Sequence, residues 1–243
     1  MKLSDKLEFG HEDRRLIYEY IESHGAVTPK ELERTLRVDP SGLKHHIAIL
    51  KRDGLIEVAD DKLLVSIEAG TEEEFTDEGV DYTIRPARQE DLTGLVGAIR
   101  QVSEEKTYIV GESVADVIDH EEVLLRHNEL ESRMFFVACV NREVVGWVHL
   151  SAPELEKLGH TAELTVGVID EYRGHGIGSH LLHRGLEWAG ENGFEKIYNS
   201  VPSTNTDAIQ FLETHDWEIE ATRAKHYKLG DTYIDEVMMA VRL

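Results

Sequence analysis

Apolar residues recur at helical spacing over residues 13–24 and again over residues 40–52. Between them, the run 28–31 combines an N-cap threonine, a proline at the first helical position and a glutamate placed for a capping box, so another helix is predicted to begin there. Two short apolar runs, 55–58 and 63–67, predict two strands joined by an acidic turn. The start of the chain is therefore predicted to form three helices followed by a hairpin.

Strand and helix patterns also alternate farther along the chain. Alternating or β-branched apolar runs predict strands, helical periodicity predicts helices, and the polar link Asn141-Arg142 suits a hairpin. The predicted strands span residues 82–86, 133–140, 143–150, 163–169, 196–201, 217–227 and 233–243, and the predicted helices span 91–100, 114–128, 179–192 and 205–215. This layout predicts a mixed α/β domain.

An acidic segment separates the two patterns. Residues 69–80 contain two glycines and show no sustained periodicity, so they are predicted to form a linker. We therefore expect a small domain over residues 1–68 and a larger one over residues 81–243. A chain of 243 residues is long enough for two domains that each bury a core.

The net charge of the chain is −22, from 48 acidic and 26 basic side chains. Residues 1–68 hold 11 Lys or Arg against 14 Asp or Glu, net −3, which leaves −19 for residues 69–243. Salt screens such a surface, since the Debye length falls to about 3 Å at 1 M. A halophilic source is therefore expected ahead of a basic partner.

The single cysteine, Cys139, excludes an internal disulfide and a cysteine-rich zinc site. We therefore expect no metal site and a reducing, cytoplasmic setting. No apolar stretch approaches the roughly 20 residues that span a bilayer, and the amino terminus lacks the apolar core of a signal peptide, so no membrane contact is expected. The oligomeric state stays open, a homodimer included.

The first three helices and the hairpin resemble, in order and length, a winged helix-turn-helix domain, in which the helix over residues 40–52 would read DNA. Four basic residues stand against one acidic residue over positions 37–52, which favours contact with phosphates. The alternative is a domain for dimerisation or acceptor docking. The candidate DNA-binding residues are Ser41, Lys44, His45, Lys51 and Arg52.

A glycine-rich turn follows the predicted strand 163–169 and precedes a predicted helix. Glycines let backbone amides approach an anion, and the helix amino terminus adds a favourable dipole, so a pyrophosphate site is predicted. Ser179 stands where a dinucleotide fingerprint needs its third glycine, and no Gly-Lys-Ser/Thr completes a Walker A loop. A glycine-rich turn without a ligand is the remaining alternative. The turn consists of Arg173, Gly174, His175, Gly176, Ile177 and Gly178.

The segment from Val166 to Ser179 resembles motif A of the GNAT superfamily, and the stretch from His160 to Leu164 resembles its phosphinothricin-acetyltransferase-like branch. The segment from Asn205 to Trp217 resembles the one that follows in that family, and the order of strands and helices over residues 81–243 agrees. The resemblance implies a GNAT fold, a mixed and mostly antiparallel sheet flanked by helices. It also implies acetyl-CoA as acyl donor and a primary amine as acceptor.

The resemblance further implies roles for single residues. Backbone amides of residues 175–179 would hold the pyrophosphate, with support from Arg173. Val166 and Val168 would pair through their backbones with the pantetheine arm, as an added strand, and an amide near Val168 would polarise the thioester carbonyl. Asn205 would hold the cofactor arm.

An amine with a pKa of about 10.4 must lose a proton before it attacks. In the family branch named above, the residue equivalent to Glu163 serves as this base, directly or through water; the alternative is an edge-strand carboxylate that faces solvent. His160 is a second candidate. Many family members place a Tyr, and the phosphinothricin branch a His, where this chain has Leu212, so water or Tyr227 would protonate the thiolate instead.

Tyr108 lies where the acceptor-site loop of the family falls, and an ordinary packed aromatic is the alternative for it. The sequence thus predicts an N-acetyltransferase that acts by direct attack in a ternary complex on a small-molecule or protein amine, joined to a DNA-binding domain. The alternative is a non-catalytic regulator of transcription that senses acyl-CoA, and Leu212 is the feature that keeps it open.

Overall fold

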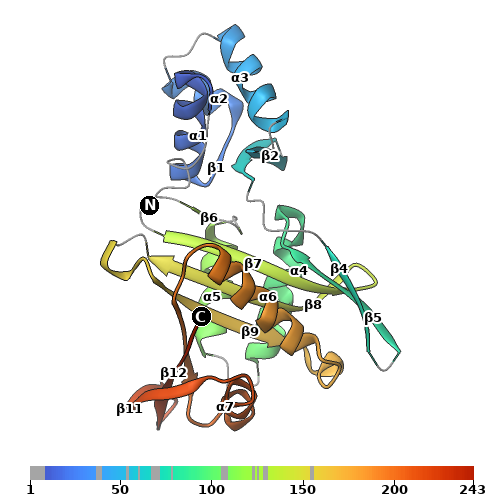
Figure 1. The fold of residues 1–243 in the computed structure, drawn as a ribbon, viewed down its shortest axis with the longest axis vertical. Helices are drawn as coiled ribbons and strands as arrows, with labels where there is room; N and C mark the ends of the chain where they lie inside the picture. The colour runs from blue at the N-terminus through green and yellow to red at the C-terminus, as the bar shows by residue number, and fades with distance from the viewer. Residues whose placement is uncertain are drawn as a thin grey trace.

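The computed structural model describes residues 9–36, 40–52, 55–59, 61–66, 72–77, 79–104, 109–121, 124, 126–127, 131–153 and 156–243, and the structural statements below concern these residues. A small helical domain, blue in Figure 1, lies at one end of the long axis, and a larger domain built on a sheet lies at the other. No described helix is both long and apolar enough to cross a membrane.

The amino-terminal domain has its own core, which includes the buried side chains of Ile17, Ile21 and Leu50. A capping box starts its second helix, because Thr28 Oγ1 accepts from the Glu31 amide and the Glu31 carboxylate accepts from the Thr28 amide. The strands pair antiparallel in the order β1-β3-β2. The predicted helices and hairpin are confirmed, and β1 is a third strand too short to leave a pattern. The elements are α1 (Glu12–His24), β1 (Ala26–Val27), α2 (Pro29–Thr35), α3 (Pro40–Arg52), β2 (Ile56–Ala59) and β3 (Lys62–Val65).

The larger domain is a sheet in the order β11-β12-β10-β9-β8-β7-β5-β4, with β6 beside β7. Strands β9 and β10 are parallel and the other described pairs of this sheet are antiparallel, which confirms the mixed, mostly antiparallel sheet. The strands are β4 (Glu73–Asp77), β5 (Val80–Pro86), β6 (Arg126–His127), β7 (Glu131–Val140), β8 (Glu143–Pro153), β9 (Thr161–Val168), β10 (Lys196–Pro202), β11 (Glu218–Leu229) and β12 (Thr232–Arg242). The helices are α4 (Leu92–Ser103), α5 (Ile109–Glu121), α6 (Ile177–Glu191) and α7 (Thr206–Glu213), with short 3-10 turns η2 (Gln89–Asp91), η3 (Glu156–Leu158) and η4 (Asp170–Tyr172).

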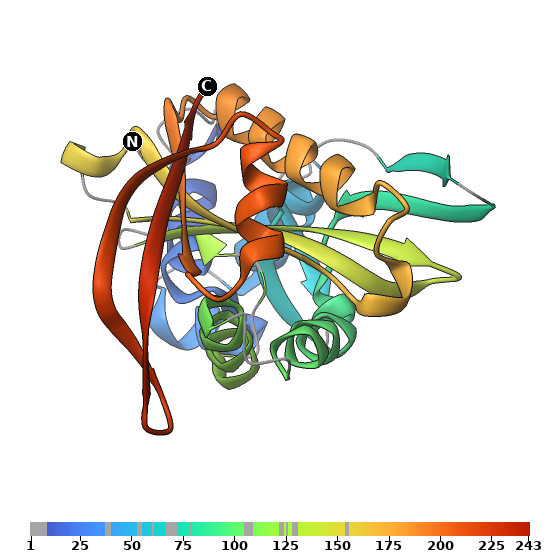
Figure 2. The same ribbon diagram turned by 90° about the horizontal axis from the view of Figure 1, so that it is seen from below.

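Helices cover both faces of this sheet. Figure 2 shows α4 and α5 on one side and α6 on the other, while the β11–β12 hairpin curls past the end of the sheet. Each face has its own apolar cluster, with Leu181 and Ile197 in one and Ile99 and Trp147 in the other. The Trp147 ring lies so close to β9 that a Cβ at Gly167 would collide with it. Glycine at 167 therefore lets the indole pack against the strand backbone.

Two sequence predictions in this domain are wrong. Residues 73–77, predicted as part of the linker, form β4, which pairs with β5 and stacks Phe75 on Tyr82 at 5.4 Å between ring centroids. Half-buried and exposed positions alternate along this edge strand, but acidic residues occupy both kinds of position, so the sequence shows no strand pattern. The helix predicted to run to residue 128 ends at Glu121, and residues 126–127 pair with β7 as β6.

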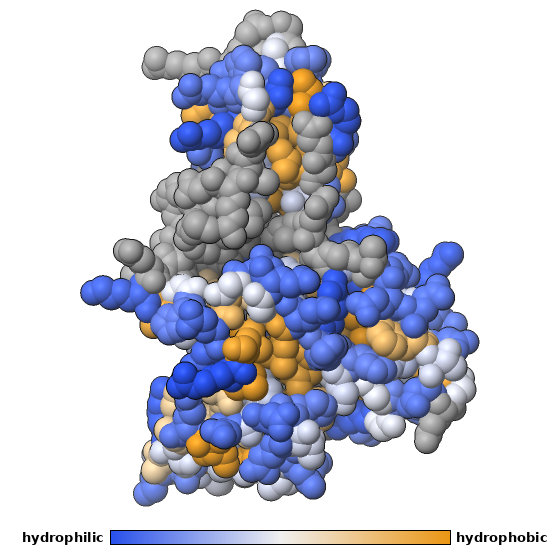
Figure 3. All heavy atoms as spheres, in the orientation of Figure 1, coloured by the Kyte–Doolittle hydropathy of each residue, from blue (hydrophilic) through white to orange (hydrophobic). Residues whose placement is uncertain are grey.

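The two domains meet beside β2. Burial raises the pKa of Glu57 on that strand, Arg88 of the larger domain opposes the shift, and Glu90 adds to it. The coloured residues in Figure 3 are mostly hydrophilic and surround a few hydrophobic patches, in keeping with a chain in which 30% of residues are charged.

Candidate functional site

The parallel strands β9 and β10 separate after a short contact. They pair over residues 161–163 and 196–198, and beyond that point β9 stays with β8 to Val168 whereas β10 stays with β12 to Pro202. In the described structure, one edge of β9 therefore has no strand partner over residues 164–168. Unpaired N–H and C=O groups on such an edge can bind an extended ligand as an added strand.

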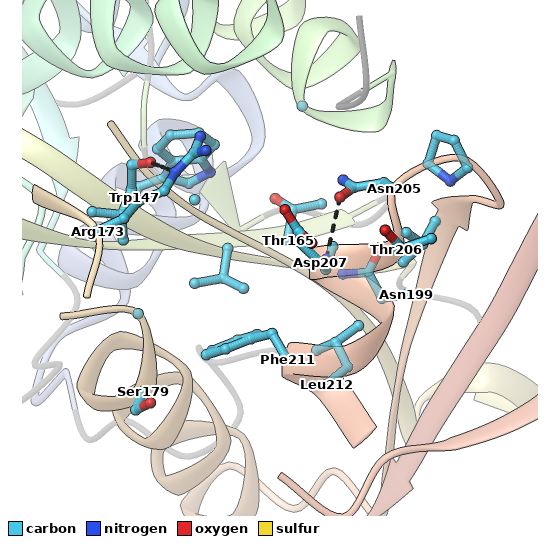
Figure 4. A pocket seen from close by; sticks show the side chains of 18 of the residues that line it. Trp147, Thr165, Arg173, Ser179, Asn199, Asn205, Thr206, Asp207, Phe211 and Leu212 are labelled. Atoms are coloured by element: carbon cyan, nitrogen blue, oxygen red, sulfur yellow. Dashed lines mark hydrogen bonds between the residues drawn. The ribbon is translucent and has the colours of Figure 1, made fainter. Parts of the chain in front are cut away.

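A cavity of about 570 Å³ opens where the strands separate (Figure 4). It contacts residues from β9, β10, the glycine-rich turn and α7. Of the residues predicted for the cofactor, those on its wall are Val166, Val168, Arg173, Gly174, Gly176, Gly178, Ser179 and Asn205. The polar residues that sequence reasoning missed are Thr165, Asn199, Ser200, Thr204, Thr206 and Asp207.

Helix α6 begins at this cavity without a capping side chain. Its N-cap residue, Gly176, has a left-handed φ of 69°. Because glycine has no side chain, no side-chain oxygen accepts from the first amides of the helix. None of the amides of residues 177–179 donates a hydrogen bond within the described chain. Unpaired amides and the helix dipole are the features that favour an anion at a helix amino terminus.

The turn is braced from two sides. Tyr82 Oη on β5 donates to the His175 carbonyl at 3.3 Å and contacts His180 Nδ1 at 2.6 Å. On the other side, His215 Nε2 lies 3.0 Å from Ser179 Oγ, while its Nδ1 lies 2.7 Å from the carbonyl of Phe211. A carbonyl only accepts, so Nδ1 of His215 carries the proton and, in the neutral ring, Nε2 accepts from the serine hydroxyl. Sequence reasoning missed all of these braces because they join distant segments.

Four predicted cofactor residues have local structural roles. Arg173 Nε donates to the Val168 carbonyl at 3.0 Å and its Nη1 lies 3.2 Å from Asp170, so the side chain ties the turn to the end of β9. Asn205 accepts from the Ala208 amide at 3.2 Å as the N-cap of α7. Ile177 is buried in the core, and neither Ile177 nor His175 is on the cavity wall.

Glu163 lies where β9 and β10 part, opposite Tyr198 in the parallel pair. It is half-buried, and burial followed by the nearby charge of Glu236 raises its pKa. Thr165, two residues along the same strand face, lines the cavity, and two strand residues span about 6.6 Å.

Glu236 on β12 is 3% exposed and belongs to a small charged network. Its Oε1 accepts from Tyr227 Oη at 3.2 Å, and its Oε2 lies 2.9 Å from Arg223 Nη1. Burial, then Glu236, raises the pKa of Tyr227. Tyr227 lies off the cavity wall and donates to Glu236, so the geometry does not support it as the proton donor to a thiolate.

The other candidates are placed as follows. Leu212 is buried and lines the cavity, so an apolar group stands at the position of the usual acid. His160 is exposed, precedes β9 and is off the cavity wall. Tyr108 lies outside the described residues.

The predicted DNA-binding residues lie on α3. Lys44, His45, Lys51 and Arg52 are exposed, and Leu43 and Leu50 point into the core. Ser41 is in the first turn, and its side chain lies outside the described part. The helix thus presents basic residues on its outer face, as the sequence predicts.

Comparison with known proteins gives two family matches. The model of the acetyltransferase (GNAT) family matches residues 96–217, half of the chain, and a model described as a helix-turn-helix domain matches residues 9–59. Among curated proteins, the L-amino acid N-acetyltransferase AaaT of Escherichia coli K12 is 26% identical over 106 residues. That match covers 43% of this chain, and the chain spans 65% of the length of this relative.

Solved structures share the fold of the larger domain. A structure of yncA from Salmonella typhimurium, described as an acetyltransferase with its cofactor acetyl-CoA, is 18% identical with a TM-score of 0.55 and covers 67% of this chain and 94% of that one. A protein named as a phosphinothricin N-acetyltransferase is 20% identical with a TM-score of 0.55, over 67% of this chain and 98% of that one. From the family model that matches half of its length, the chain belongs to the acetyltransferase (GNAT) family.

Proposed function

We propose that this protein is an N-acetyltransferase that transfers the acetyl group of acetyl-CoA to a primary amine by direct attack in a ternary complex. The family assignment and the relative described with acetyl-CoA support the donor. The observation that carries the proposal is the cavity between the separated strands, which has a turn with unpaired amides on one side and a half-buried carboxylate, Glu163, nearby.

The residues of the cavity fit acetyl-CoA. The uncapped amides of residues 177–179 would bind the pyrophosphate, and the glycines at 174 and 176 leave room for it. The open edge of β9 over residues 164–168 would pair with the amides of the pantetheine arm. An amide at the end of this edge, near Val168, would donate to the thioester oxygen as negative charge develops on it. When bound, acetyl-CoA supplies the acyl group and the thiol leaving group.

Glu163 is the proposed general base. A carboxylate whose pKa is raised accepts a proton from an ammonium group more effectively than an ordinary glutamate does. Glu163 lies two strand residues, about 6.6 Å along the backbone, from Thr165 on the cavity wall, so we propose transfer through one water molecule. Leu212 has no proton to give, and Tyr227 donates its hydroxyl proton to Glu236 in a hydrogen bond. The thiolate that leaves is therefore proposed to take its proton from water.

The acceptor is a small-molecule or protein amine. The relatives are named for L-amino acids and for phosphinothricin, which favours a small amine for this chain as well and supports the phosphinothricin-like branch. The acceptor would reach Glu163 from the side of the sheet that carries Tyr198 and Glu236.

The amino-terminal domain is proposed to bind DNA through α3. The helix-turn-helix family match and the exposed Lys44, His45 and Lys51 support this role. Because phosphate contacts dominate such binding, its affinity is expected to fall steeply with salt.

The buried Leu212 favours a second candidate function, an acyl-CoA-sensing regulator without turnover. A coenzyme A release assay with a panel of primary amines, from low to molar salt, separates the two functions. Turnover by the wild type that is lost in Glu163→Gln supports the enzyme. Tight acetyl-CoA binding with no turnover on any amine would favour the regulator, and no acetyl-CoA binding would contradict both.

A further inference from the structure

Three side chains with metal-binding groups lie close together in the amino-terminal domain, away from the cavity between β9 and β10. His11 is the N-cap of α1, Asp13 lies in the first turn of that helix, and His46 lies on α3. One ligand atom from each lies within 4.8 Å of the other two. Asp13 Oδ2 is 3.7 Å from His11 Nδ1 and 3.6 Å from His46 Nε2. Ligands around a tetrahedral zinc ion, with bonds of about 2.1 Å, lie about 3.4 Å apart.

His46 is poorly satisfied without a ligand. It is 8% exposed, and its Nε2, the ring nitrogen that would bind the ion, lies 3.6 Å from Asp13 Oδ2, too far for a hydrogen bond. The His11 and His46 rings lie 4.7 Å apart between centroids, tilted by 36°. Buried polar groups are normally paired, so Nε2 of His46 at this distance from Asp13 has room for a ligand between the two residues.

The ligand set selects a class of ion. Two imidazoles and one carboxylate suit zinc(II) and its neighbours cobalt(II) and nickel(II), whereas magnesium and calcium prefer all-oxygen sites. The side chains of His11 and Asp13 are 49% and 40% exposed, which leaves a route from solvent and room for water as a fourth ligand. We propose that His11, Asp13 and His46 bind one divalent ion of the zinc class, with water completing a tetrahedral set.

Two local features oppose the ion. His11 Nδ1 accepts a hydrogen bond from the Asp13 amide at 3.1 Å, and the metal would replace this bond. Arg14 is nearby, but its guanidinium is turned aside and donates to the Phe9 carbonyl at 2.9 Å. In the proposed site, the charge of Asp13 and the two imidazole ligands would offset these costs.

The ion would join the start of α1 to α3. His46 directly follows His45 on the helix proposed to contact DNA, so metal binding would fix that helix against the domain core. The expectation of no metal site rested on the single cysteine. It overlooked ligands at positions 11, 13 and 46, which the fold brings together.

Titration of chelator-treated, untagged full-length protein with cobalt(II) tests the site. We expect one equivalent to bind with the visible absorption bands of tetrahedral cobalt, and zinc(II) to displace it. Asp13→Asn and His46→Gln are expected to weaken binding at least tenfold, since even partners of the ligands change affinity 10- to 100-fold. His120→Gln, at an exposed histidine on α5, is the control and should bind like the wild type.

Hydrogen exchange gives an independent readout. With free zinc(II) at 100 times Kd, amides of α1 and α3 that exchange through opening of the site are expected to exchange about 100-fold more slowly, while α6 is unchanged. Asp13 is half-exposed, so Asp13→Asn is expected to fold. This variant still tests the site if His46→Gln fails to fold. Wild-type protein with no saturable cobalt band, or variants that bind as tightly as the wild type, would overturn the proposal.

Discussion

Tyr227 donates a hydrogen bond to the buried carboxylate of Glu236, with 3.2 Å between Oη and Oε1. The phenol is therefore engaged away from the cavity, and Glu236 lies close enough to Glu163 to raise the pKa of that carboxyl group. Tyr227 lies on β11 and Glu236 on β12, so this hairpin affects the proposed base, Glu163, through the charge of Glu236. It also explains why the pKa of Glu163 is raised beyond the effect of burial.

Glu236→Gln is expected to change the pH dependence of turnover. Glu163 acts as a base only when deprotonated, so kcat/KM falls as pH drops through its raised pKa. Removal of the Glu236 charge lowers that pKa, and the acidic limb of the pH profile should move to lower pH. Glu220→Gln, at an exposed carboxylate paired with Lys196, is the control. An acidic limb that stays in place in Glu236→Gln would show that the two carboxylates are not coupled.

Glu163→Gln is expected to lower kcat about 10²- to 10⁴-fold, the usual range for loss of a general base. The dissociation constant of acetyl-CoA should not change, because Glu163 is off the cavity wall. Steady-state kinetics and calorimetric titration measure the two quantities. Unchanged kcat would remove Glu163 from the mechanism.

Gly176→Ala is expected to weaken acetyl-CoA binding about 5- to 30-fold. A left-handed conformation costs a non-glycine residue roughly 1–2 kcal/mol, so the turn should shift and withdraw the amides of α6. Gly193→Ala is a matched control, since Gly193 has a φ of 84° but lies off the cavity wall. Both variants should lose similar thermal stability, and only Gly176→Ala should lose affinity for acetyl-CoA. Equal affinity in both would argue against the turn as the anion site.

Gly167→Ala is expected to destabilise the larger domain by about 1–3 kcal/mol, as overpacking of a core commonly does. The added methyl group would collide with the buried Trp147 ring on the neighbouring strand. Gly97→Ala on α4 has open space around its Cβ and should be neutral or stabilising. Denaturant unfolding of both variants measures the difference, and equal stability would show that the ring gives way.

Lys51→Ala is expected to weaken DNA binding uniformly across sequences and to reduce the slope of log affinity against log salt by about 1. Lys157→Ala, in η3 of the larger domain, is the control and should leave DNA affinity unchanged. Fluorescence anisotropy over a salt series measures both effects. DNA affinity that is the same in wild type and Lys51→Ala would argue for the docking or dimerisation role instead.

Local signals in the sequence were sufficient for much of the fold. The Thr28–Glu31 capping box and the link at Asn141 and Arg142, both with positive φ, are determined by neighbouring residues and appear where predicted. Strand β4 was missed, because its alternating burial depends on pairing with β5 and its acidic residues resemble a linker.

The candidate site likewise contains parts that the sequence predicts and parts that it does not. The glycine-rich turn is one continuous segment, so its place on the cavity could be predicted. Tyr82 and His215 brace that turn from β5 and from the end of α7, and Glu236 acts on Glu163 from β12. Such contacts follow from topology, and sequence spacing carries no sign of them.

The most direct test of the central claim is mass spectrometry of amines incubated with isotopically labelled acetyl-CoA and the purified protein. The account predicts a labelled N-acetyl product on at least one primary amine with the wild type, and a loss of that product at least 100-fold in Glu163→Gln. Acetyl-CoA that binds in the cavity but yields no acetylated amine at any salt concentration would contradict it.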